Sequence, residues 1–208
     1  MPHIGRLHLI TDTRAGRDVL AVVAASLPAG VDTVQVRVED ATTDRDAYEL
    51  AYRVRELCRQ YGVVCLVNDR LHLALAVGAD GGHVGAADLP VAAARRVLGP
   101  EAILGASVRD PQAAKQAVAD GASYLGVGPV FGTTTKAGLP DPIGVTGIEA
   151  VASAVEVPVI AIGGVSAATV ASLRAAGAYG IAVISAVSDA PDPAAATAEL
   201  FAALDRAR

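Results

Sequence analysis

The stretch AILGASVRDPQAAKQAVADGASYLGVGPV, residues 102–130, shows how this chain is organised. A short apolar run, AILGAS, is followed by a segment with helical spacing and then by a second apolar run, YLGVGPV. The helical segment has a candidate N-cap in Asp110, Pro111 at its first position and Gly121 at its far end. The stretch therefore predicts a strand, a helix and a second strand, which is the repeating unit of a parallel α/β sheet.

The same unit recurs along the chain. Helix-like segments, such as 166–177 and the one that opens at Asp192-Pro193, separate eight short apolar runs. The runs are LHLIT (7–11), TVQVRV (33–38), VCLVN (64–68), GGHVG (81–85), AILGAS (102–107), YLGVGPV (124–130), VPVIAIGG (157–164) and YGIAVISA (179–186). No linker or low-complexity segment interrupts them. The pattern predicts a single (β/α)8 TIM barrel over residues 1–208, although a doubly wound open sheet gives the same alternation.

The composition agrees with a parallel α/β protein and indicates which kinds of binding partner to expect. Hydrophobic residues make up 52% of the 208 positions, while aromatic residues make up only 3% and Trp is absent. Buried parallel strands need a core of this small aliphatic kind. The net charge is −5 and no Lys/Arg cluster stands out, so we expect small polar ligands and no nucleic acid as partners.

The sequence also predicts a cytoplasmic protein without a membrane partner. No segment has the roughly 18 uninterrupted apolar residues of a membrane span, and residues 1–12 do not look like a signal peptide. The two cysteines, Cys58 and Cys65, lie in a predicted helix and the buried strand after it, which favours reduced core thiols. A homo-oligomer is compatible with the sequence, which does not decide the oligomeric state.

Polar or glycine residues follow every one of the eight runs. These positions are Thr11 with Asp12, Gln35 with Arg37, Asn68 with Asp69, His83 with Asp88, Ser107 with Arg109, the TTTK segment at 133–136, Gly163 with Gly164, and Ser185. Strands must end in something polar, so some of these are expected by chance. In a TIM barrel, however, the active site gathers at the carboxyl ends of the strands. Eight such ends favour one shared site.

Two of these clusters have the chemistry of phosphate ligands. Gly163 and Gly164, just before the candidate cap Ser166, offer bare backbone N–H groups to an anion, or form a tight turn that needs glycine. The TTTK segment combines three hydroxyls with Lys136, one of only two lysines in the chain. Such a segment binds a phosphate or diphosphate, or is a polar surface loop.

Asp69 and Asp88 follow consecutive predicted strands and are candidate ligands of one Mg²⁺, which takes one or two carboxylates plus substrate oxygens and water. The alternative is that each caps the following helix. With a metal, Arg37 and Lys136 would form a strongly charged anion site suited to a diphosphate. His83 fits either a barrel interior or a ligand, and the other three histidines are interpreted as structural. The sequence contains no Ser-His-Asp pattern and no nucleotide-binding glycine motif.

The motifs LHLITD, VQVR, VND, DGGHVGAAD, LGAS, YLGVGPVFGTTTK, VIAIGG and GAYGIAVISA, in this order and spacing, resemble the thiamine phosphate synthase family and the related thiazole tautomerase family. The resemblance covers essentially the whole chain. It implies a (β/α)8 enzyme that condenses 4-amino-2-methyl-5-(diphosphomethyl)pyrimidine with a thiazole phosphate, releasing diphosphate with Mg²⁺ present. It further implies a dissociative mechanism, in which the diphosphate departs first and the thiazole nitrogen traps a pyrimidine methyl cation.

The resemblance assigns roles to individual positions. It implies pyrimidine diphosphate ligands at Gln35, Arg37, Asn68, Ser107 and Lys136, among which Arg37, Ser107 and Lys136 are the candidate catalytic residues. It implies Mg²⁺ ligands at Asp69 and Asp88, and thiazole phosphate ligands at Thr133, Thr135, Gly164, Ile184 and Ser185.

Two positions depart from the family pattern. Where the family usually has R-x-K, this chain has Arg37-Val38-Glu39, which puts a carboxylate beside the expected diphosphate and leaves the exact substrates open. Arg109 stands where relatives commonly place the His on which a tautomerase relies, and Arg is no base near neutral pH. A thiamine phosphate synthase is therefore favoured. A thiazole tautomerase-like enzyme and a non-catalytic phosphate-binding barrel are the alternatives.

Overall fold

A computed structural model of the chain describes residues 4–14, 16–133, 135 and 138–207. Every one of the eight apolar runs contains a strand. The strands are β1 (Leu7–Ile10), β2 (Thr33–Val36), β3 (Val64–Asn68), β4 (Gly81–Val84), β5 (Ile103–Val108), β6 (Tyr124–Val127), β7 (Val159–Ile162) and β8 (Gly180–Val183). The helices are α1 (Val19–Ser26), α2 (Asp44–Tyr61), α3 (Leu71–Val77), α4 (Val91–Leu98), α5 (Pro111–Ala119), α6 (Gly144–Ala152), η1 (Ala167–Thr169), α7 (Val170–Ala175), α8 (Ser185–Ser188) and α9 (Pro193–Arg206).

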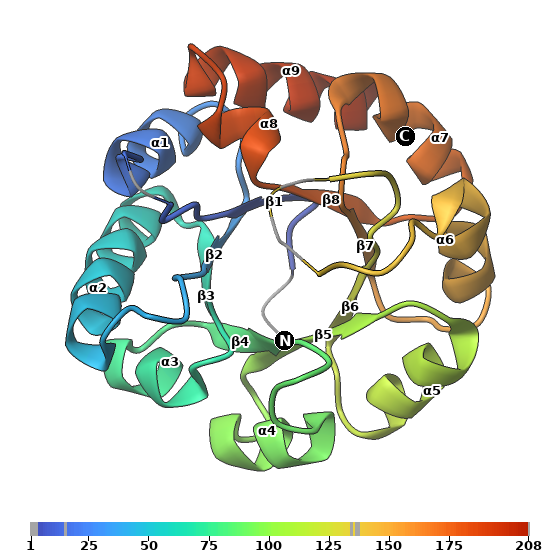
Figure 1. Cartoon of the computed structure of the whole chain (residues 1–208), viewed down its shortest axis with the longest axis horizontal. Coiled ribbons are helices and arrows are strands. Elements are labelled where there is room, and N and C mark those ends of the chain that lie inside the picture. Colours follow the sequence, from blue (N-terminus) through green and yellow to red (C-terminus); the bar gives the residue numbers. More distant parts are fainter. Residues whose placement is uncertain (1–3, 15, 134, 136–137, 208) are drawn as a thin grey trace.

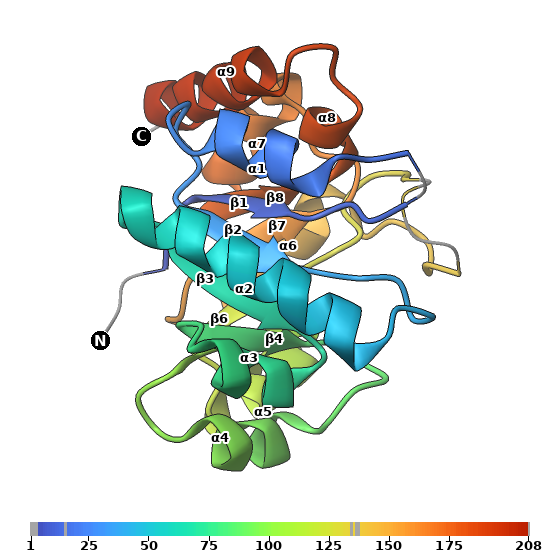
Figure 2. The same ribbon diagram turned by 90° about the vertical axis from the view of Figure 1, so that its left-hand side faces the viewer.

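The sheet closes on itself. Each strand pairs in parallel with the next one in sequence, and β8 pairs with β1, placing Leu7 opposite Ile181 and Leu9 opposite Val183. The helices form a ring around the strands (Figure 1). The connections that leave the carboxyl ends of the strands project from one end of the barrel (Figure 2). This closure confirms the TIM barrel and excludes the open doubly wound sheet.

The predicted helix caps are confirmed. The Asp110 side chain accepts hydrogen bonds from the N–H groups of Gln112 and Ala113 at the start of α5. The Asp192 side chain does the same for α9, where it accepts from the Ala195 N–H. Ser166 is the N-cap of the turn η1, where the Thr169 hydroxyl accepts from the Ser166 N–H at 3.1 Å. These side chains satisfy N–H groups that have no partner inside a helix.

Six of the eight predicted runs extend past the end of their strand, and two of them show the reason. The 33–38 run leaves the sheet after Val36, because the Thr11 hydroxyl bonds to both the N–H (2.9 Å) and the C=O (2.7 Å) of Arg37. The 179–186 run ends as a strand at Val183, and its last residues begin the short helix α8. Both differences lie at the end of the barrel where the site is expected.

Side chains alternate strictly between the two faces of the sheet. On β1, Leu7 and Leu9 join the apolar layer under the helices, whereas His8 and Ile10 face the barrel interior. Successive strand residues must point to opposite faces, so inner positions recur every second residue. The apolar part of the interior consists of Ile4, Ile10, Leu66, Ile103, Tyr124, Ile160 and Ala182.

Cys58 and Cys65 are both buried and free, as the sequence predicted. Across the part of the chain that the structure describes, no helix combines the length and the apolar character needed to cross a membrane.

Candidate active site

A cavity of about 330 Å³ opens at the carboxyl ends of the strands, a size within the usual range for small-molecule sites. Of the twelve site residues predicted from the sequence, Lys136 lies outside the described residues, and the other eleven all line this cavity. They are Gln35, Arg37, Asn68, Asp69, Asp88, Ser107, Thr133, Thr135, Gly164, Ile184 and Ser185. Thr11 and Asp12, which follow β1, are the described strand-end residues from the sequence that do not line it.

The alternation of the strands explains how several of these side chains reach the cavity. Gln35 lies between the outward residues Val34 and Val36, and Ser107 lies between Ala106 and Val108. Both are the last inward positions of their strands before the connecting loops. Asn68 occupies the equivalent position at the end of β3. Inward side chains at the carboxyl ends of parallel strands must converge on the mouth of the barrel.

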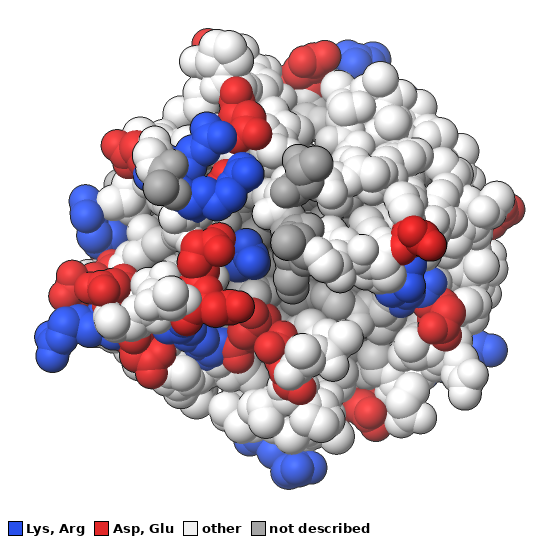
Figure 3. Space-filling model, in the orientation of Figure 1, with Lys and Arg blue, Asp and Glu red and all other residues white. Residues whose placement is uncertain are grey.

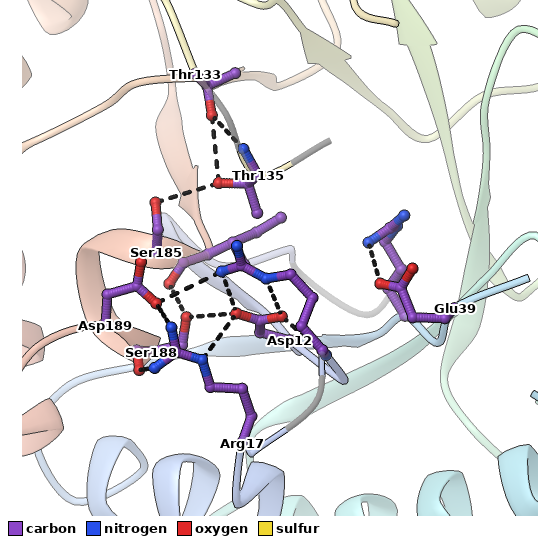
Figure 4. Close-up of polar contacts among 11 residues, drawn as sticks. Asp12, Arg17, Glu39, Thr133, Thr135, Ser185, Ser188 and Asp189 are labelled. Atoms are coloured by element: carbon purple, nitrogen blue, oxygen red, sulfur yellow. Dashed lines mark hydrogen bonds and ion pairs between the residues drawn. The ribbon is translucent and has the colours of Figure 1, made fainter. Parts of the chain in front are cut away.

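Charges of both signs gather on one half of the mouth. Figure 3 shows most of them over β1 to β4, with a smaller group of both signs on the side of α5 and α6. Arg37 lines the cavity with its side chain 20% exposed, and its guanidinium lies 3.7 Å from the Glu39 carboxylate (Figure 4). Glu39 thus puts an acid directly beside the basic group that is expected to bind the diphosphate.

Asp69 and Asp88 come from the neighbouring strands β3 and β4. Asp69 has a left-handed backbone (φ 60°), and its N–H donates to the His83 carbonyl at 2.8 Å. The Asp88 carboxylate accepts from the Gly85 N–H at 2.7 Å. The N-cap residues of α3 and α4 are Arg70 and Pro90, so neither aspartate occupies the helix-cap position that was the alternative for it.

Hydroxyl groups and glycines form the opposite half of the mouth. The Thr133 hydroxyl donates to that of Thr135, which donates to the Ser185 hydroxyl, each at 3.3 Å (Figure 4). Gly163 and Gly164 both have a positive φ (97° and 65°). A Cβ on Gly164 would lie 2.5 Å from the Gly132 carbonyl oxygen, so the glycine pair is needed for the turn itself.

Arg109 lines the same cavity from the loop after β5. Its guanidinium donates to the carbonyl of Asp141, in the long connection between β6 and α6. Arg109 therefore joins two loops of the mouth, and it remains a cation that cannot serve as a base.

Comparison with known proteins agrees with this geometry. Residues 7–187 match the family model described as thiamine monophosphate synthase. The chain belongs to this family. It is 66% identical over 206 residues to the thiamine-phosphate synthase of Salinispora arenicola (strain CNS-205), covering 98% of this chain and 99% of the relative. It is 48% identical over 199 residues to that of Chloroflexus aurantiacus (strain ATCC 29366 / DSM 635 / J-10-fl), covering 95% and 91%.

A solved structure extends the comparison. The chain superimposes on the thiamine phosphate pyrophosphorylase from Pyrococcus furiosus with a TM-score of 0.88 and 37% identity, covering 97% of this chain and 96% of that one. A 3-hexulose-6-phosphate synthase at 20% identity and a TM-score of 0.72 shares the fold alone. Membership of the thiamine monophosphate synthase family confirms the resemblance seen in the sequence. The chain is an enzyme of thiamine biosynthesis and a transferase.

The floor of the cavity holds a group of rings that the sequence only partly indicated. His83 was left between two interpretations, and Tyr124 was not singled out. Both are buried, and burial lowers the pKa of His83 to about 4 and raises the pKa of Tyr124 above its usual range. Burial likewise lowers the pKa of His8 to about 4. All three rings are therefore neutral at pH 7.

Asp12, which follows β1, is also buried, and it joins the first and last βα units of the barrel. The Arg14 guanidinium donates to both carboxylate oxygens (2.8 and 2.6 Å), and this lowers the pKa of Asp12 to about 2. Asp12 also accepts from the Ser188 hydroxyl on α8 at 3.2 Å (Figure 4). Arg17 bonds Asp189 next to it. This network fixes the helix that starts at Ser185.

Proposed function

We propose that the protein condenses 4-amino-2-methyl-5-(diphosphomethyl)pyrimidine with a thiazole phosphate to give thiamine phosphate and diphosphate. The observation that carries this proposal is the division of the cavity into two halves. The ends of β2 to β5 contribute charged and amide groups, and the ends of β6 to β8 contribute hydroxyls and glycines. Two differently charged anions can thus be held on opposite sides of one cavity.

The charged half suits the diphosphate. Arg37, Asn68 and Ser107 would donate hydrogen bonds to its oxygens, together with Lys136 from outside the described residues. Asp69 and Asp88 would hold Mg²⁺, which when bound neutralises charge on the leaving diphosphate.

The donor set available for that ion fits Mg²⁺ completed by a ligand. Among the described residues, no three His, Cys, Asp or Glu side chains come together as a metal cluster. Two carboxylates at the ends of neighbouring strands are what Mg²⁺ needs when substrate oxygens and water fill its remaining positions. Tight binding of Mg²⁺ should therefore require the diphosphate.

The other half suits a phosphate monoester. The hydroxyls of Thr133, Thr135 and Ser185 are already close to one another, and the backbone at Gly164 and Ile184 borders the same space. These groups would orient the thiazole so that its ring nitrogen faces the pyrimidine methylene group. Orientation of this kind removes much of the entropic barrier to a reaction between two molecules.

The bond changes require no protein nucleophile. The bond between the methylene carbon and the diphosphate oxygen breaks, and its electron pair leaves with the oxygen. The lone pair of the thiazole nitrogen then forms the new C–N bond. Hydrogen-bond donors aimed at the leaving oxygens would stabilise the charge that develops there. The side chains of Ile10, Ile160 and Ile162, which line the floor, would keep water from the cation.

A coupled assay tests the proposal. Purified protein is incubated with both phosphorylated heterocycles and Mg²⁺, and thiamine phosphate and diphosphate are measured together. We expect equal amounts of the two products, dependence on both substrates, and loss of activity with excess chelator. Diphosphate release without the thiazole phosphate would indicate a hydrolase. Absence of product under all conditions would reject the synthase.

A further inference from the structure

A chain of hydrogen bonds lies along the floor of the cavity and ends at Ser107. The Gln35 amide nitrogen donates to the Tyr124 hydroxyl at 3.4 Å. The Tyr124 hydroxyl lies 2.9 Å from Nδ1 of His83, and Nε2 of His83 lies 2.9 Å from Oγ of Ser107. All four members line the cavity; three of them are buried, and Ser107 is the exposed one.

The number of protons available decides which group donates in each of these hydrogen bonds. A neutral imidazole has one N–H donor and one acceptor nitrogen, and a tyrosine hydroxyl has a single proton. If Nδ1 of His83 carried the proton, the Tyr124 oxygen would accept two hydrogen bonds, and its own proton would need a further acceptor. The described residues offer the Tyr124 hydroxyl no partner besides Gln35 and His83.

In the opposite arrangement, the protons of Tyr124 and His83 both have an acceptor. The Tyr124 O–H donates to Nδ1, and the Nε2–H of His83 donates to Ser107. Neither Tyr124 nor His83 then has a proton without an acceptor, which would be costly in the barrel interior. The Ser107 oxygen accepts from the imidazole, so its own proton is free to point into the cavity.

Two glycines on neighbouring strands make room for the rings. A Cβ on Gly105 would lie 2.2 Å from Cζ of Tyr124 and 2.3 Å from Nδ1 of His83. A Cβ on Gly126 would lie 3.0 Å from Cε1 of His83. Both glycines sit at inward positions of β5 and β6, where any side chain would displace the imidazole. The backbone of two strands is therefore built around this arrangement of His83.

We propose that Tyr124 and His83 are positioning residues that fix the Nε2–H form of the imidazole and thereby commit the Ser107 hydroxyl to donate its proton to a substrate oxygen. The role of Ser107 toward a substrate rests on the proposed function, whereas the direction of the hydrogen bonds does not. A hydroxyl held as a donor needs no reorganisation when negative charge develops on the leaving group.

The direction of the chain is tested by ¹⁵N NMR of histidine-labelled protein at neutral pH. The spectrum of His83→Gln identifies the His83 signals among those of the four histidines. We expect a proton on Nε2 and none on Nδ1 in the wild type, and a loss of this preference in Tyr124→Phe. A proton on Nδ1 in the wild type overturns the proposal, whatever the kinetics show.

Kinetics test the effect on Ser107. Tyr124→Phe should lower kcat about tenfold with little change in KM, because the hydrogen bond matters most when charge develops. In a Ser107→Ala background the same change should have no further effect, since neighbours that act through one group are not additive. Independent effects of the two changes, or an unchanged kcat in Tyr124→Phe, would overturn the positioning role.

Two comparisons separate positioning from a structural defect. His83→Gln can still donate to Ser107, whereas His83→Met has a similar length and cannot, so Gln should retain more kcat than Met. Equal loss in both variants would overturn the proposal. Tyr61→Phe, on the exposed end of α2, serves as the control for removal of a tyrosine hydroxyl. Failure of the wild type to make product would reject the proposed function and leave the spectra to decide the direction of the chain.

Discussion

At the scale of single residues, an acid stands beside the basic group that is expected to bind the diphosphate. The Glu39 carboxylate is half exposed (49%) and lies 3.7 Å from the Arg37 guanidinium. An exposed pair of this kind contributes little to stability. Its main consequence is electrostatic, because a negative charge next to Arg37 opposes the approach of a diphosphate.

We therefore expect Glu39→Gln to tighten binding of the pyrimidine diphosphate by less than about tenfold, consistent with an exposed pair worth about 1 kcal/mol or less. The gain should shrink at high ionic strength, because salt screens exposed charges. Titration of the diphosphate substrate at low and high salt measures both effects. The same affinity for both proteins at low salt would show that Glu39 does not influence the bound anion.

Asp69→Asn and Asp88→Asn test the proposed metal site, and Asn suits position 69 because it tolerates the left-handed backbone found there. Each change should lower turnover by about 100-fold or more through lost stabilisation of the leaving group. Calorimetry should show weak Mg²⁺ binding without diphosphate and stronger binding with it, reduced in both variants. Glu156→Gln, in the exposed loop before β7, is the control. Diphosphate binding that is unaffected by chelator would contradict a shared ion.

Which site residues the sequence could predict depends on their place relative to the strands. Gln35, Asn68 and Ser107 were predictable because the two-residue period of a strand fixes their direction. The contact between Arg37 and Glu39 was not predictable, because both residues lie beyond the end of β2, where that period no longer applies.

At the scale of elements, the ends of the strands were also harder to predict from the sequence than the starts of the helices. The caps Asp110 and Asp192 were predictable because a helix start has a local chemical signature. The early end of β2 depends on the Thr11 hydroxyl, which is distant in sequence from Arg37. The apolar residues of α8 resemble the end of a strand, so only the network around Asp12 shows why a helix starts there.

That network predicts the effect of Asp12→Asn. The change removes a charge that the Arg14 guanidinium contacts directly, and it should lower the free energy of unfolding by about 2 kcal/mol. It should also raise KM for the thiazole phosphate more than for the pyrimidine diphosphate, because α8 begins with Ser185. Chemical denaturation and the two KM values are the measurements. Asp189→Asn, which changes a half-exposed member of the same network, should cost less than about 1 kcal/mol. An equal loss of unfolding free energy in both variants would show that the burial of Asp12 does not add to its contribution to stability.

At the scale of the whole molecule, the closure of the barrel was the feature that periodicity could not decide. An open sheet and a closed barrel share the same alternation of strands and helices, and they differ in the pairing of β1 with β8. Closure also creates an interior in which polar residues are shielded from water. His8 and His83 lie there as neutral rings, and this links the stability of the fold to pH.

The sign of that dependence follows from the lowered pKa values. The pKa of His8 is about 4 in the folded protein and 6.5 for an unperturbed imidazole, so between these values the unfolded state binds more protons. Stability should therefore rise with pH across this window and fall as pH drops from 6.5 toward 4, by up to about 3 kcal/mol for this residue. His83 should add to the effect, because its pKa is lowered to about 4 as well.

Replacing His8 isolates its share of this acid sensitivity. His8→Gln removes the titrating group, and the slope of unfolding free energy against pH between 6.5 and 4 should become smaller than in the wild type. The Gln side chain does not fill the space of the imidazole, so the free energy of unfolding at pH 7 should also fall. The test therefore compares the slopes and not the absolute stabilities. His72→Gln, which makes the same change at an exposed imidazole on α3, is the matched control. Urea unfolding at intervals of pH measures all three proteins, and parallel curves for wild type and His8→Gln would show that burial of His8 does not set the acid limit of the fold.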